Sequence, residues 1–83
     1  MEKTQPPGKS GNPIDNCSFD ILTQAGKKAD FLHSAIDTYI ADAKAANRDE
    51  LAKLWHTIKE DELRHLDMLK VELAKDVREG RLK

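Results

Sequence analysis

The stretch KEDELRHLDMLK, residues Lys59–Lys70, decides how the chain folds and which chemistry it carries. Glu62 and His65 stand three residues apart, so a helix places them one turn apart on the same side. A period of 3.6 residues through this region also collects one apolar stripe. Its members are Leu51, Leu54, Trp55, Ile58, Leu66, Leu69 and Leu73. Glu62 falls within this stripe and His65 beside it, so the pair needs either an opposite charge or a metal ion.

Composition limits the classes of protein to which the chain can belong. It has 83 residues and a formal net charge of -1, with acidic and basic residues interspersed. We therefore expect one domain, no nucleic-acid partner and no membrane span. The single cysteine, Cys17, excludes an internal disulfide, and the N-terminus lacks the apolar core of a signal peptide. These features predict a location in the cytoplasm or inside a cytoplasmic protein compartment.

The chain divides into an arm, a helical hairpin and a short tail. Residues 1–17 are predicted to form a flexible N-terminal arm, because MEKTQPPGKSGNP is rich in proline, glycine and polar residues. Residues 18–80 are predicted to form the hairpin: a helix over 19–46 with Ser18 as its N-cap, a turn over 47–49, and a helix over 50–79. Residues 81–83 form the tail. One unbroken helix is the alternative, but Asn47 suits a helix end and favours the hairpin.

The predicted first helix has the apolar repeat of a bundle helix. Two sets recur every seven residues: Leu22, Ala29, Ile36 and Ala43, and Ala25, Leu32, Tyr39 and Ala46. A hairpin of two helices cannot cover its own apolar stripes. We therefore expect an all-α fold in which the hairpin pairs with a second chain, around a two-fold axis, into a four-helix bundle.

Antiparallel pairing of the helices gathers metal-type side chains at one height. A turn at Asn47 sets His33 level with Glu62 and Asp30 level with His65. Asp37 lies one turn beyond His33 on the same edge of the first helix. The two-fold axis then brings a second Glu62 and His65 to the same core, so one chain supplies half a site. The candidate metal ligands are Glu62, His65, His33, Asp30 and Asp37, with no catalytic group expected beyond them.

The segment LAKLWHTIKEDELRHLDML, Leu51–Leu69, resembles the corresponding helix of rubrerythrin-type proteins, in which an L-A-x-L-F segment leads into E-x-x-H. In its length and its single hairpin the chain is similar to the encapsulated ferritins, and the likeness covers about Phe31–Leu73. This resemblance implies a ferritin-like di-iron carboxylate protein. It implies iron bound between subunits of a homo-dimer or higher homo-oligomer, a ferroxidase-type oxidoreductase activity for iron storage or protection against oxidative stress, and a surrounding protein shell.

One feature departs from that family. A ligand glutamate is expected about thirty residues before Glu62, but the matching zone, residues 29–33, contains none. Asp30 and His33 stand there instead, and aspartate is shorter by one methylene. The alternatives are one iron per chain, another divalent metal, or loss of the oxidation chemistry.

A second hypothesis belongs to another class of protein. In it the chain is a non-catalytic helical oligomerisation or adaptor module, and Glu62 and His65 are polar groups that select the correct packing partner.

Overall fold

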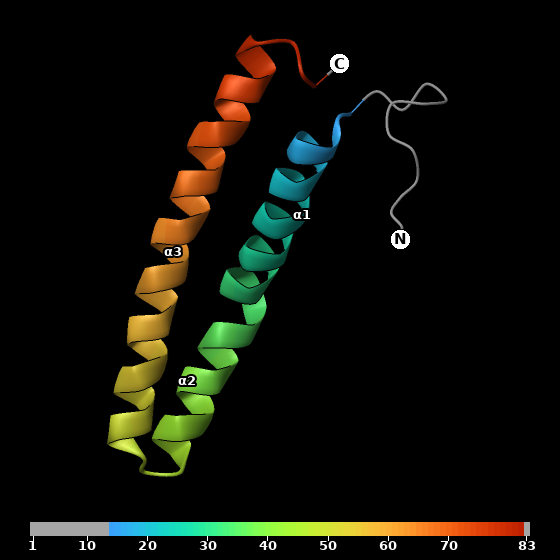
Figure 1. The fold of residues 1–83 in the computed structure, drawn as a ribbon. Coiled ribbons are helices and arrows are strands. Elements are labelled where there is room, and N and C mark those ends of the chain that lie inside the picture. Colours follow the sequence, from blue (N-terminus) through green and yellow to red (C-terminus); the bar gives the residue numbers. More distant parts are fainter. Residues whose placement is uncertain (1–13, 83) are drawn as a thin grey trace.

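The computed structural model describes residues 14–82 and folds them into an antiparallel helical hairpin (Figure 1). The first arm contains α1 (Asn16–Asp30), the π-helical turn η2 (Phe31–Ala35) and α2 (Ile36–Ala45). The second arm is α3 (Asp49–Arg78), which runs back beside α2 and then α1. The predicted all-helical hairpin is confirmed for the described residues.

The hairpin turn is made by Asn47, which adopts a positive φ of 59°. The Arg48 N–H donates to the Ala43 carbonyl at 2.8 Å, and the Asn47 N–H donates to the Lys44 carbonyl at 3.0 Å. These two bonds form a Schellman motif, which ends a helix by satisfying its last carbonyl groups. Asparagine tolerates the left-handed conformation better than most residues. The chain therefore reverses here instead of continuing as one long helix.

The first helix begins three residues earlier than predicted. Its N-cap is Asp15, whose Oδ1 accepts the Ser18 N–H at 2.8 Å. The prediction of Ser18 as the cap was wrong: Ser18 lies inside α1, is fully buried, and donates its hydroxyl to Asp76 Oδ2 at 2.6 Å. The predicted flexible N-terminal arm covered residues 1–17. Of these, residues 1–13 lie outside the described part of the chain, whereas residues 14–17 belong to the fold.

Two residues of the predicted tail, Arg81 and Leu82, contact the start of α1. Gly80, with a φ of 76°, ends α3. The Arg81 guanidinium then approaches Asp15 Oδ2 at 3.5 Å, and Leu82 forms an isolated β-bridge with Ile14. This clasp closes the open end of the hairpin.

The π-helical turn shifts the inward face of the first arm. The Ile36 N–H donates to the Phe31 carbonyl, five residues back, which is the π-helical pattern. The Ser34 hydroxyl donates to the Asp30 carbonyl at 3.1 Å, and such back-bonding bends helices. Near this turn Ala29 is exposed, against the predicted seven-residue repeat, whereas Lys28 is half-buried.

The hairpin is a single layer with a small core. Its overall dimensions are 54 × 27 × 14 Å, and the shortest is close to the diameter of one helix. The buried apolar side chains are Ile36, Ile40, Ala43 and Ala52. None of the described helices is long and apolar enough to cross a membrane.

Candidate metal centre

Glu62 and His65 meet on the side of α3 that faces α1. Glu62 Oε1 lies 3.1 Å from His65 Nδ1. The Glu62 side chain is 26% exposed and that of His65 46%, so the pair lies at the edge of the helix interface. An ionised carboxylate only accepts hydrogen bonds, and the contact therefore assigns a proton to Nδ1. The predicted proximity of these two side chains is confirmed.

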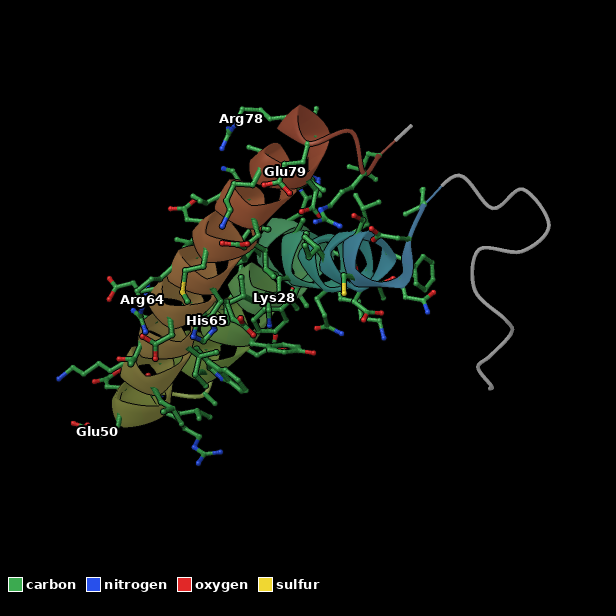
Figure 2. The ribbon with its side chains drawn as sticks, turned by 45° about the horizontal axis from the view of Figure 1, so that its top comes forward. Lys28, Glu50, Arg64, His65, Arg78 and Glu79 are labelled. Carbon is green, nitrogen blue, oxygen red and sulfur yellow. The ribbon has the colours of Figure 1, made fainter. Side chains whose placement is uncertain are left out.

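A third side chain, Lys28 from α1, completes the cluster. Its Nζ lies 3.1 Å from Glu62 Oε1, the same oxygen that His65 contacts. Figure 2 shows Lys28 and His65 approaching each other from the two arms, and both line one shallow hollow. The hydrogen bonds from His65 and then from Lys28 hold the pKa of Glu62 below its usual range. The carboxylate is thus ionised and neutralised within one chain.

The spacing of Glu62 and His65 suits shared coordination of one ion. Two ligand atoms that each lie about 2.1 Å from a transition metal, at right angles, are about 3 Å apart. The observed separation of Oε1 and Nδ1 is 3.1 Å. A metal in this position would take the Nδ1 lone pair, with the ring proton carried on Nε2. The separation is that of an ordinary hydrogen bond, and it is also compatible with contact of both atoms with one ion.

The three other candidate ligands lie apart from this pair. Asp37 binds the ammonium of Lys59, with Oδ1 and Nζ 3.0 Å apart. Lys59 and His65 project from α3 about 120° apart, so Asp37 is drawn to the flank opposite His65. Asp30 and His33 are exposed, and their side chains make no hydrogen bond or ion pair with any residue between 14 and 82. The arrangement of one chain therefore groups Glu62 with His65 alone among the five candidates.

A complete metal site does not occur within the described residues of one chain. Among residues 14–82, no group of three or more histidine, cysteine, aspartate or glutamate side chains is placed to hold a metal ion. Catalytic and structural transition-metal sites commonly use three or four protein ligands. Any site built on Glu62 and His65 consequently needs further ligands from another chain or from solvent.

Sequence reasoning missed Lys28. The seven-residue repeat placed Ala29 inward, whereas Lys28 is the residue that forms an ion pair with α3. The signal available in the sequence was the pair Ser34 and Thr38. The hydroxyl of each can donate to the backbone carbonyl four residues earlier and so disturb the helical period.

Apolar surface surrounds the pair on the side of the hairpin that carries His65. The hollow next to it is lined by Gln24, Lys28, His65, Met68 and Leu69. Met68 is 60% exposed and Leu54, on the same flank of α3, is 51% exposed. Further toward the turn, the rings of Tyr39 and Trp55 are 5.0 Å apart. We call this side, with Leu54, His65 and Met68, the His65 face.

Comparison of the chain with protein-family models, with curated proteins and with solved structures finds no match.

Proposed function

We propose that two hairpins pair through their His65 faces and bind a divalent transition metal between Glu62 and His65 of both chains. Iron is the metal that we propose first. The observation that carries this proposal is the 3.1 Å separation of Glu62 Oε1 and His65 Nδ1 at the edge of an apolar face. Carboxylate and imidazole together suit iron, and zinc or manganese are its nearest competitors.

A second copy of the chain supplies what one hairpin lacks. Domains are normally built from at least two packed layers, and this hairpin is one layer only 14 Å thick. Large apolar side chains, Leu54 and Met68 among them, remain exposed beside the pair. Pairing like faces around a two-fold axis covers them and brings two carboxylates and two imidazoles together. Four protein ligands are enough for one metal ion, or for two ions that retain water ligands.

Bound Fe²⁺ would then be the substrate of a ferroxidase reaction. Four Fe²⁺ ions give up one electron each, and one O₂ molecule takes these four electrons with four protons to form two water molecules. The anionic oxygens of Glu62 favour Fe³⁺ over Fe²⁺, which is the contribution that this chain makes to the reaction.

The test is elemental analysis of the purified protein after anaerobic loading with Fe²⁺ and removal of unbound metal. We expect one iron or fewer per chain in the natural protein and none in Glu62→Ala or His65→Ala. Glu60→Ala and His56→Ala are matched controls, because both residues are exposed on α3 outside the pair. They should keep the iron. Iron content that is absent throughout, or equally high in all five proteins, would refute the proposed site.

One observation favours a second candidate, an assembly module that uses no metal. Lys28 already neutralises Glu62 within the chain, so the carboxylate has a partner without any ion. In that case a chelator leaves the melting temperature and the oligomeric state unchanged. A metal-binding dimer instead loses thermal stability on chelation, because a ligand that binds only the folded state stabilises it.

A further inference from the structure

We propose that Lys28 competes with the metal ion for Glu62. Its ammonium group binds the Glu62 carboxylate until a metal ion displaces it. This inference rests on the proposed function and adds to it a control of metal loading. It assigns a role to the one side chain of the first arm that forms an ion pair with Glu62 in the described part of the chain.

The geometry places two groups on one oxygen atom. Lys28 Nζ and His65 Nδ1 are each 3.1 Å from Glu62 Oε1. A metal ion bound by Oε1 and Nδ1 would lie about 2.1 Å from both atoms. It would then share Oε1 with the ammonium group. Two cations on one oxygen atom repel each other, so binding of the metal favours departure of Lys28.

Lys28 is able to leave because its surroundings are open. Its side chain is 24% exposed and lines the shallow hollow beside Met68. Lysine carries its charge on a flexible four-carbon stem, so the ammonium can swing into water while the stem stays against apolar surface.

The position of Lys28 depends on the fold and not on the local charge pattern. Lys27 is its neighbour in the sequence and is exposed, and it makes no ion pair within residues 14–82. Lys28 is half-buried and forms an ion pair with Glu62 of α3, whereas Ala29 is exposed. The two adjacent lysines therefore form a natural pair of test and control residues.

The experiment measures binding of Co²⁺, an air-stable stand-in for Fe²⁺, by visible absorption and by calorimetry. The proteins are the natural chain, Lys28→Met, Lys28→Gln and the control Lys27→Met. Each of the two Lys28 variants should bind Co²⁺ about tenfold more tightly than the natural chain, equivalent to about 1.4 kcal/mol. Lys27→Met removes the same charge from the same helix and should match the natural chain. Circular dichroism confirms that each variant is folded, and the two Lys28 variants guard against failure of either one.

The outcomes separate the two proposals. If the natural chain binds Co²⁺ and the Lys28 variants bind it no more tightly, competition by Lys28 is refuted while the proposed function stands. If the Lys28 variants bind and the natural chain does not, Lys28 is confirmed as the competing cation but the metal-binding function fails for the natural chain. If all four proteins fail to bind Co²⁺ or Fe²⁺, both proposals are refuted. An equal gain in Lys27→Met would reduce the effect to net charge and would also refute competition.

Discussion

Ile36 is the apolar side chain on which the hairpin depends most. It is fully buried at the start of α2, directly after the π-helical turn. Truncation of Ile36 to alanine removes buried methyl groups and leaves a cavity, which costs about 2–5 kcal/mol. We expect urea unfolding of Ile36→Ala to show a loss of this size, enough to unfold much of so small a protein. Val71→Ala is the control, since Val71 is 60% exposed and its loss should cost about 0.5 kcal/mol or less. Equal losses in the two variants would contradict the core described above.

Asn47 is the residue that reverses the chain. Its φ of 59° lies in the left-handed region, where glycine is unstrained and alanine pays about 1 kcal/mol or more. Asn47→Gly should therefore keep or slightly raise the melting temperature, and Asn47→Ala should lower it. Thermal unfolding of both variants decides the matter, and an alanine variant as stable as the glycine variant would rule out the left-handed turn.

Single residues of the candidate site were only partly predictable. The spacing of Glu62 and His65 on one helix fixes their contact, because residues three apart on a helix are always neighbours. The partner of Glu62 was not predictable in this way, since it depends on how two helices are rotated relative to each other. Asp37 shows the same limit: its ion pair with Lys59 draws it to the other flank of α3.

At the scale of elements, we interpret η2 as a one-residue insertion within the helix of the first arm. Leu32, Ile36 and Ile40 follow one another at steps of four residues, longer than the helical period of 3.6. Deletion of Ser34 shortens one step to three and should turn η2 into α-helix without rotating α1 or α2. We expect this variant to stay folded with unchanged helix content by circular dichroism. Deletion of Ala41, which is exposed and outside η2, should rotate Ala43 out of the core and destabilise the protein. Unfolding of the Ser34 deletion, with the Ala41 deletion intact, would refute this interpretation.

The start of α1 gives a pH-dependent prediction. The N–H of Ser18 donates to Asp15, and this bond, with Arg81 nearby, lowers the pKa of Asp15 below the ordinary range of an aspartate. A carboxylate with a lowered folded-state pKa stabilises the fold above its unfolded pKa of about 4, and this stabilisation is lost as the pH falls through the folded-state value. Asp15→Asn keeps a good N-cap but removes the charge. Its melting temperature should lie below that of the natural protein at pH 7, with the difference disappearing near pH 2. A constant difference across this range would contradict the role of the charge.

The presence of the helices was predictable from the sequence, whereas the set of residues that face inward on the first arm was not. The apolar periodicity of residues 51–73 and the turn signal at Asn47 depend on local chemistry, and both gave the right elements. The π-helical turn rests on a competition between backbone and hydroxyl hydrogen bonds. A seven-residue repeat does not contain this information, and Ala29, which the repeat placed inward, is exposed.

At the scale of the whole molecule, the proposed dimer must form through the His65 face. Met68 and Val71 are both 60% exposed on α3, but only Met68 lines the hollow beside His65. Met68→Lys should bring a charge into the interface and shift the protein toward monomers in sedimentation velocity. Val71→Lys should leave the oligomeric state unchanged. Dissociation by Val71→Lys alone would place the interface on another side of α3.

The most direct measurement of the central claim is native mass spectrometry of the protein loaded anaerobically with Fe²⁺, because it counts chains and metal ions in the same particle. We expect a species of two chains, or a multiple of two, with at most one iron per chain, and we expect Glu62→Ala and His65→Ala to carry none. Single chains without iron, or dimers whose iron content ignores both substitutions, would contradict the claim that two Glu62–His65 pairs form one metal site.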